Sequence, residues 1–343
     1  MQTSVSVILC THNPRPDYLS RVLASLRGQT LPAEQWEFLL IDNASHQPLA
    51  EIWDISWHSR GRHIREDELG LTAGRLRGIQ ESSGKLLVFV DDDNLLAPDF
   101  LEQAKAISAR FPVMGVFGAG ILEPEFEVQP PPELRSRLNL MALRSAASAR
   151  WTKDARDAQC RPWGAGLCVT RHVANLYCQF VADLGITAVL DRRGRRLFSG
   201  GDDLFSRVAA RGGLWFGVFP ELRITHLIAA GRLTQHYLLR LIHDHALSHG
   251  VFDYMLDAVQ PRRIDVIRYV HLLLHATKNG LFSMRCQWAA SRGMDGAAQF
   301  ISANRLKPVG FGRSVYAGTP GTSFPFRAST SGHADITDVC SNR

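Results

Sequence analysis

Short apolar runs alternate with helical spacing over residues 1–120 of the chain. The segments 4–10 (SVSVILC), 37–42 (EFLLID) and 85–91 (KLLVFVD) are strongly apolar and predict buried strands. Between them, apolar residues recur at helical spacing in 18–26 and 71–80, which predicts two amphipathic helices. Strands that alternate with helices are typical of βαβ units, so we expect an α/β fold with a mixed, mostly parallel sheet flanked by helices.

The pattern becomes more varied between Pro98 and Gly231. Pro98 can open a helix, and 114–121 (MGVFGAGI) predicts another strand. Prolines interrupt 122–162, which predicts a surface excursion with a helix and a candidate lid. Regular structure then returns as strands at 164–170, 214–219 and 222–227, a helix at 172–183, and a helix that follows the turn 199–203 and ends at Ala210.

Beyond Gly231 the pattern is helical and basic, with predicted helices at 233–247, 264–276 and 286–303. Residues 316–343 are rich in Gly, Ser, Thr and Pro and predict a disordered tail. The sequence therefore predicts three parts, which are an α/β domain at 1–231, a basic helical region at 232–315 and the tail at 316–343.

With 343 residues, of which 45% are hydrophobic and 21% are charged, the chain has enough apolar material to exclude disorder throughout. No apolar stretch reaches the roughly 18 residues of a membrane-spanning helix. The N-terminus lacks the basic and apolar segments of a secretory signal. The six cysteines fall at irregular spacings without a CxxC pair, which argues against a disulfide framework and a zinc ribbon. A cytoplasmic protein fits these features best.

The formal net charge of +6 comes from one region. Residues 232–313 hold 11 Lys or Arg and 5 Asp or Glu, and this difference accounts for the whole +6. Such a region could bind anionic lipid, nucleic acid or a phosphorylated substrate, or could be a solvated helical surface, and charge alone does not choose among these. Our hypothesis is that its amphipathic helices rest against the inner face of the membrane and receive a lipid-linked acceptor.

Acidic residues cluster at two places in the first 231 residues. Asp91, Asp92 and Asp93 follow a predicted strand directly, where ligands bind in open α/β sheets. A divalent cation such as Mg²⁺ or Mn²⁺, bridging to a diphosphate, would compensate their mutual repulsion, whereas an acidic helix cap is the alternative. Asp202 and Asp203 begin another helix, either as caps or as a general base.

Four segments in this order resemble the family 2 glycosyltransferases, which are inverting enzymes with the GT-A fold. These segments are SVILCTHNPRPDYLSRVLASLRGQ, WEFLLIDNAS, ELGLTAGRLRGIQESSGKLLVFVDDDN and SGGDDLFSRVAARGG. The third contains the family's DxD motif as Asp91 and Asp93, and the fourth resembles its GED segment. The segment 231–240 (GRLTQHYLLR) also resembles a part of bacterial members.

The resemblance assigns roles to individual residues. It implies that the nucleotide sugar contacts six positions: Thr11, Asn13, Asp42, Arg75, Asp91 and Asp92. It implies Mn²⁺ or Mg²⁺ held by Asp93, Asp91 and His226, an acceptor held by Trp163, Gly164 and Asp202, and Asp203 as the catalytic base. Two positions depart from the family. Leu76 replaces an Asn after the aligned arginine, and Asp202 replaces the usual Glu.

The reaction that the resemblance implies is a metal-dependent single displacement in glycan or polysaccharide biosynthesis. A sugar would move with inversion from a nucleoside diphosphate, expected to be UDP, to a hydroxyl of a saccharide or lipid-linked acceptor. A nucleotidyltransferase is one alternative, although CTHNPRP provides no Gly-rich phosphate loop. The other is a non-catalytic module whose basic helices bind membrane or nucleic acid, but we expect no nucleic-acid partner.

Overall fold

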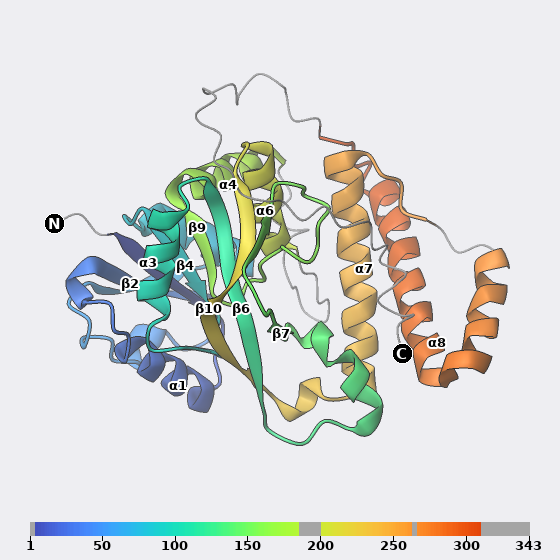
Figure 1. Cartoon of the computed structure of the whole chain (residues 1–343), viewed down its shortest axis with the longest axis horizontal. Coiled ribbons are helices and arrows are strands. Elements are labelled where there is room, and N and C mark those ends of the chain that lie inside the picture. The colour runs from blue at the N-terminus through green and yellow to red at the C-terminus, as the bar shows by residue number, and fades with distance from the viewer. Residues whose placement is uncertain (1–3, 185–199, 263–265, 310–343) are drawn as a thin grey trace.

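The computed structural model describes residues 4–184, 200–262 and 266–309. The predicted tail at 316–343 lies outside the described residues, as do Ser199 of the predicted turn 199–203 and the side chains of 266–279. Within the described residues, a ten-stranded sheet with helices on both faces forms the body of the molecule (Figure 1). Its strand order is β3-β2-β1-β4-β9-β6-β10-β5, with β7 paired to β6 and β8 paired to β10.

The strands of the sheet are β1 (Val5–Thr11), β2 (Trp36–Asn43), β3 (Gly61–Glu66), β4 (Leu86–Val90), β5 (Asn94–Leu96), β6 (Met114–Phe126), β7 (Arg144–Ser145), β8 (Arg150–Thr152), β9 (Leu167–Thr170) and β10 (Trp215–Ile228). The helices are α1 (Pro16–Arg27), α2 (Leu71–Glu81), α3 (Phe100–Arg110), α4 (Arg171–Leu184), α6 (Gly201–Arg211), α7 (Gln235–Asp257) and α8 (Val266–Ala303). Short 3₁₀ helices lie at η1 (Ala33–Gln35), η2 (Leu49–Glu51), η3 (Pro132–Met141) and η4 (Ala230–Arg232).

The first half of the sheet is parallel, as the alternating pattern predicts. β1 pairs in parallel with both β2 and β4, and β2 pairs in parallel with β3. Thr11 lies opposite Asp42 at the ends of β1 and β2, so the carboxyl ends of these strands meet at one edge. In the second half, β9 and β5 run antiparallel to their neighbours, so the whole sheet is mixed. The predicted fold class is confirmed.

Apolar residues of β1 alternate between two cores, one on each face of the sheet. Val5, Val7 and Leu9 pack into the core that also contains apolar residues of α1 and α3. Ile8 and Cys10 pack into the core on the other face, with α4 and α6. This two-residue period on a fully buried strand explains why five of the seven residues of β1 are apolar.

Several predicted boundaries are wrong. β3 escaped prediction because Ile64 is its one fully buried residue. The two strands predicted at 214–219 and 222–227 are one strand, β10, which is irregular between Phe219 and Arg223. Pro220 lies within this irregularity, and its missing N–H explains why pairing breaks there. β6 is longer than predicted, and the helix expected in the 122–162 excursion is the 3₁₀ helix η3.

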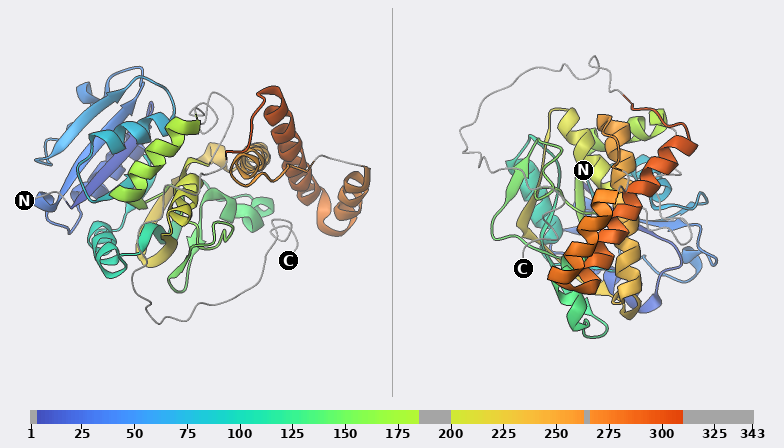
Figure 2. Two further views of the ribbon diagram at one scale, coloured as in Figure 1. Left: turned by 90° about the horizontal axis from the view of Figure 1, so that it is seen from above. Right: turned by 90° about the vertical axis from the view of Figure 1, so that its right-hand side faces the viewer.

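The C-terminal region consists of α7 and α8, with α7 between the sheet body and α8 (Figure 2). Val251 and Met255 of α7 pack against Ala297 and Ile301 of α8. The helix predicted at 233–247 extends to Asp257, and the two helices predicted beyond it lie within α8. Gly280 lies between these two predicted helices, and its φ of 81° and ψ of 162° interrupt α8 there. In the described residues no helix is both long and apolar enough to cross a membrane.

Candidate functional site

The end of β4 brings the predicted donor acids next to the end of β1. The Thr11 hydroxyl donates a hydrogen bond to the Asp92 carboxylate. Burial raises the pKa of Asp92 to about 6 although the Thr11 hydrogen bond opposes this, and the neighbouring charges of Asp93 and Asp91 add to the rise. The groups around Asp92 therefore do not fully compensate the negative charge of its carboxylate.

Asp93 faces β10 and the segment that follows it. Arg232 Nη1 lies 2.8 Å from Asp93 Oδ2 and 3.1 Å from His226 Nε2, and the Asp93 and His226 atoms are 3.4 Å apart. Burial would raise the pKa of Asp93, but His226 and Arg232 hold it below its usual range. Arg232 also donates from Nε to the Tyr237 hydroxyl at 3.1 Å. One guanidinium nitrogen thus lies between an anionic oxygen and an imidazole nitrogen.

Arg75 of α2 lies beside Asp91 and is only 4% exposed. Arg75 Nη2 is 3.9 Å from Asp91 Oδ1. Burial alone would lower the pKa of Arg75, but the carboxylates of Asp91 and Asp202 more than offset this and raise it. Arg75 is therefore a fixed positive charge between the acids that follow β4 and the acids that begin α6.

The residues predicted to hold the nucleotide base lie at the ends of β1 and β2. The Asp42 carboxylate accepts hydrogen bonds from Ser45 N at 3.0 Å, Leu49 N at 3.1 Å and Arg65 Nη1 at 2.8 Å. Asn13, with a φ of 47°, accepts from His46 N at 2.9 Å. The Asp42 carboxylate therefore orders the loop after β2, and Asn13 holds that loop against the end of β1.

Asp202 and Asp203 are adjacent in sequence but their carboxylates contact different groups. Asp202 Oδ2 accepts a hydrogen bond from Gly164 N at 2.9 Å. Asp203 forms ion pairs with Arg161 Nε at 2.6 Å and with Arg207 Nε at 3.0 Å. Burial opposes ionisation of Asp203, but Arg161 and Arg207 hold its pKa below the usual range.

Arg207 extends the Asp203 contacts to the C-terminal region. Its Nη2 lies 2.5 Å from Asp253 Oδ1, and its Nη1 lies 2.9 Å from Asp257 Oδ2, both on α7. Arg211 adds a contact from Nη2 to Asp257 Oδ1 at 2.9 Å. These ion pairs join α6 to the end of α7, and they run from the buried Arg207 side chain to the exposed Asp257 carboxylate.

The predicted acceptor-side loop lies against Arg75. The guanidinium of Arg144 stacks 4.0 Å from the centre of the Trp163 ring. A Cβ at Gly164 would lie 2.6 Å from Arg75 Nη2, so a larger residue would displace the arginine. The close approach of Gly164 to both Arg75 and Asp202 requires a residue without a side chain.

The structure brings most of the predicted residues to one edge of the sheet. Three further residues contact the predicted site residues or their partners, although the sequence pattern did not single them out: Arg161, Arg232 and Tyr237. Resemblance of the 231–240 segment to bacterial family members was the available signal for Arg232 and Tyr237. Among the described residues, no three His, Cys, Asp or Glu side chains gather as a ready metal site.

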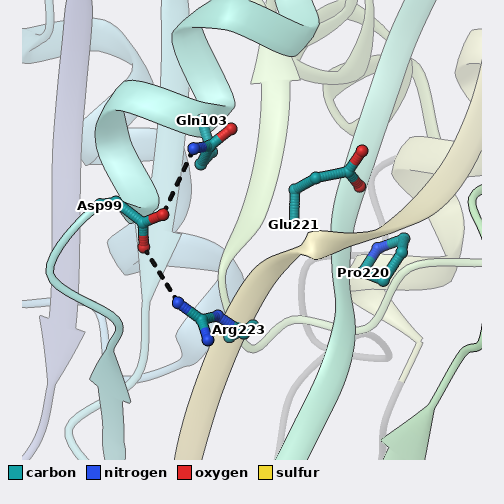
Figure 3. Close-up of a pocket in the computed structure, with 5 residues that line it drawn as sticks. All are labelled: Asp99, Gln103, Pro220, Glu221 and Arg223. Atoms are coloured by element: carbon teal, nitrogen blue, oxygen red, sulfur yellow. Dashed lines mark hydrogen bonds and ion pairs between the residues drawn. The ribbon is translucent and has the colours of Figure 1, made fainter.

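A separate hollow lies between α3 and β10 (Figure 3). It is lined by Asp99, Gln103, Pro220, Glu221 and Arg223 and contains none of the predicted site residues. Arg223 Nη2 lies 3.6 Å from Asp99 Oδ1, and Gln103 Nε2 donates to Asp99 Oδ2 at 3.3 Å. Three of the five lining residues, Asp99, Gln103 and Arg223, therefore already contact one another.

Comparison with known proteins relates the α/β sheet and its acidic edge to one family. Residues 6–142 match the model of Glycosyl transferase family 2, so this part of the chain is a family 2 glycosyltransferase domain. EpsH of Bacillus subtilis (strain 168) is 28% identical over 102 residues, which cover 29% of this chain and 29% of EpsH. The glycosyltransferase AglE of Haloferax volcanii is 32% identical over 92 residues, which cover 26% of this chain and 30% of AglE.

These matches span less than a third of either curated relative. Among solved structures, TarS 1–349 of S. aureus aligns with a TM-score of 0.44 at 13% sequence identity. That alignment covers 88% of this chain and 91% of the TarS chain. The structure of TarS 1–349 in complex with UDP aligns with the same TM-score and the same coverage.

Proposed function

We propose that the chain transfers a sugar from a nucleoside-diphosphate sugar to a hydroxyl of a saccharide or lipid-linked acceptor in glycan biosynthesis. The observation that carries this proposal is the acidic edge at Asp91, Asp92 and Asp93, which lies inside the family 2 match of residues 6–142. A UDP-linked sugar is the expected donor, because the family resemblance favours uridine.

The donor is assigned to the edge formed by β1, β2 and β4. Arg75 is the buried cation that would neutralise the diphosphate, and Asp91 and Asp202 hold it in place. Thr11 and Asn13 are assigned to the nucleoside. Asp42 is assigned to the same site through the loop after β2, because its carboxylate already accepts three internal hydrogen bonds.

We assign a divalent cation to Asp93, which follows β4, and to His226 of β10. Asp93 Oδ2 and His226 Nε2 already face one positively charged nitrogen of Arg232, and His226 Nδ1 is buried without a hydrogen-bond partner among the described residues. Carboxylate oxygen with imidazole nitrogen suits Mn²⁺ better than Mg²⁺. When bound, the cation would stabilise negative charge on the departing diphosphate, with Asp91 as the remaining predicted ligand.

The chain's own acids perform the proton transfer in this proposal. A carboxylate of the Asp202 and Asp203 pair takes the proton of the acceptor hydroxyl, while that oxygen attacks the anomeric carbon and the diphosphate leaves with the bonding electrons. The anomeric configuration inverts, and no covalent enzyme intermediate forms. The family resemblance gives the proton to Asp203.

Nucleotide release from a panel of nucleoside-diphosphate sugars, with Mn²⁺ or Mg²⁺, tests the proposal. We expect release from one donor, and an Asp93→Asn variant should be about 100-fold slower or worse because it loses the charge that faces His226 and Arg232. Asp99→Asn is the matched control, since Asp99 lies in the separate hollow. A native chain that binds no UDP and releases nucleotide from no donor would overturn the proposal.

Contact of the basic α7 and α8 region with anionic lipid is part of the same proposal. Its support is the excess of basic residues in 232–313 and the exposed side chain of Leu281 just after the break at Gly280. Flotation with anionic vesicles at low salt tests it, and protein that stays entirely in the soluble fraction contradicts it.

A further inference from the structure

The segment between β6 and β9 carries an excess of positive charge beside the acids that begin α6. Residues 132–162 hold 7 Lys or Arg and 3 Asp or Glu, which is a formal net charge of +4. At the end of this segment, Arg161 Nε lies 2.6 Å from Asp203 Oδ1. Two residues further on, Gly164 N donates to Asp202 Oδ2 at 2.9 Å. The residues predicted to hold the acceptor therefore adjoin a basic segment, whereas the predicted donor acids follow β4.

Arg144 of β7 reaches from β6 to the loop that precedes β9. β7 pairs with β6 through Arg144 and Leu122. The Arg144 guanidinium lies 4.0 Å from the centre of the Trp163 ring, and its Nη2 donates to the Arg161 carbonyl oxygen at 2.8 Å. Arg161 contacts Arg144 through its backbone and Asp203 through its side chain, so a single residue separates the Arg144 cation from the acid pair.

In the part of the chain that the structure describes, no carboxylate pairs with Arg144. Its Nη1 is withdrawn from water and has no hydrogen-bond partner there. Burial lowers the pKa of Arg144 to about 10, although Cys160 opposes this. Arg75 and Arg207 are the opposite case, because neighbouring carboxylates raise the pKa of each despite burial. Arg144 is therefore a half-buried cation whose charge the described residues leave uncompensated.

Arg171 shows how this fold satisfies a guanidinium that has a purely structural role. Its Nε and Nη1 donate to the carbonyl oxygens of Gly84 and Ile79 at 3.0 Å and 2.8 Å, and its Nη2 donates to the Ser82 hydroxyl at 2.8 Å. All three nitrogens of Arg171 thus have partners. A buried donor without a partner is unfavourable, so the orphaned Nη1 of Arg144 requires another explanation.

We propose that Arg144 pairs with an oxyanion of the acceptor, a phosphate or a carboxylate, and so places a nearby acceptor hydroxyl at the acid pair that begins α6. This inference rests on the proposed function and specifies the chemical class of its acceptor. A guanidinium can donate two parallel hydrogen bonds to either oxyanion. The pairing also offsets the repulsion that an anionic acceptor meets from Asp202 and Asp203. The oxyanion belongs either to a glycan or to the phosphate of a lipid-linked acceptor.

Calorimetry on the full chain, saturated with UDP and Mn²⁺, tests the glycan source with matched sugars. UDP is assigned to the site at Arg75, so the second ligand reports on the acceptor side. We expect glucose 6-phosphate and glucuronate to bind about 10-fold to 100-fold more tightly than glucose. Arg144→Gln should abolish this preference and leave the affinity for UDP unchanged. Arg156→Gln is the matched control, because Arg156 lies in the same segment but is exposed and pairs with Asp154.

Farnesyl phosphate and farnesol, each in detergent micelles, test the lipid source of the oxyanion. If the anion belongs to a lipid, farnesyl phosphate should bind more tightly than farnesol to the native chain, and equally to Arg144→Gln. The pair with the larger preference that depends on Arg144 identifies the source. Equal binding of charged and neutral ligands in both pairs overturns the inference. A preference that Arg144→Gln keeps, or that Arg156→Gln loses equally, also overturns it, and UDP binding leaves the proposed function intact in each case.

Urea unfolding and a lysine variant separate a ligand contact from a structural role. Since the Arg144 charge is uncompensated, Arg144→Gln should unfold at or above the native urea midpoint. Arg144→Lys keeps the charge and should retain part of the preference for the charged ligand even if its midpoint falls. A lower midpoint of Arg144→Gln together with an unchanged preference assigns Arg144 to structure and overturns the inference. A native chain that neither binds UDP nor releases nucleotide from any donor overturns the proposed function itself.

Discussion

The acids that follow β4 and the acids that begin α6 carry similar charge, but the chain compensates them differently. Around Asp203 the positive charges are Arg161 and Arg207, which come from a neighbouring loop and from the same helix. Asp93 instead receives Arg232 from η4, between β10 and α7. The Asp203 arginines join α6 to a neighbouring loop and to the end of α7, whereas Arg232 joins Asp93 to β10 and to the start of α7 at the edge of the sheet.

This difference separates charge used for stability from charge open to a ligand. Asp203 belongs to a buried network, so its loss would leave arginines without their partner. Asp92 keeps a raised pKa because burial and two neighbouring acids outweigh its hydrogen bond from Thr11. A cation or hydrogen-bond donor from a ligand would therefore gain more at the β4 end than at Asp203.

Removing the buried charge should have the largest effect. Asp203→Ala leaves Arg161 without its ion-pair partner and takes one of three carboxylates from Arg207, so the free energy of unfolding should fall by about 3 to 5 kcal/mol. Urea unfolding measures this loss. Asp17→Ala is the contrast, because the Arg15 to Asp17 pair is exposed and screened by solvent, so its loss should change the free energy of unfolding far less. Equal losses in both variants would contradict the distinction between the clusters.

The sequence predicted the parallel half of the sheet well because β1, β2 and β4 are buried on both faces and are therefore mostly apolar. It missed β3 and divided β10, since an edge strand with one buried residue and a strand interrupted at Pro220 lack that pattern. In these strands the local pattern of apolar residues indicates which residues are buried, but it says little about which strands pair with each other.

The candidate site shows the same limit. Asp91, Asp92 and Asp93 could be predicted because they follow an apolar strand directly. The partners Arg161 and Arg232 could not, because each is separated from its acid by many residues and reaches it only through the fold. Adjacent acids such as Asp202 and Asp203 are also indistinguishable in sequence, since their side-chain directions decide their roles.

The pH dependence of stability should reveal the uncompensated acid. The folded chain holds the pKa of Asp92 at about 6, above its ordinary value of 3.8, so the stabilising contribution of protonated Asp92 is complete below pH 3.8 and is lost as pH rises through 6. Asp92→Asn removes this loss. Relative to the native chain, the variant should gain about 3 kcal/mol of unfolding free energy between pH 4 and pH 8. Urea unfolding across this range measures the difference, and a constant difference would show that Asp92 is not the titrating group.

The smallest expected effect concerns Arg232 and tests whether the β4 end is open to a cation. Its Nη1 lies between Asp93 Oδ2 and His226 Nε2, so a divalent cation at those atoms must displace a positive charge. Arg232→Gln should therefore bind Mn²⁺ about tenfold more tightly without nucleotide, since two positive charges at a partly buried site repel each other by about 1 to 4 kcal/mol. Calorimetry with Mn²⁺ alone measures this, and Arg223→Gln, which pairs with Asp99 instead, should leave the affinity unchanged. Weaker Mn²⁺ binding in Arg232→Gln would show that the arginine supports the cation instead of occupying its place, and both clusters would then use their arginines to hold structure.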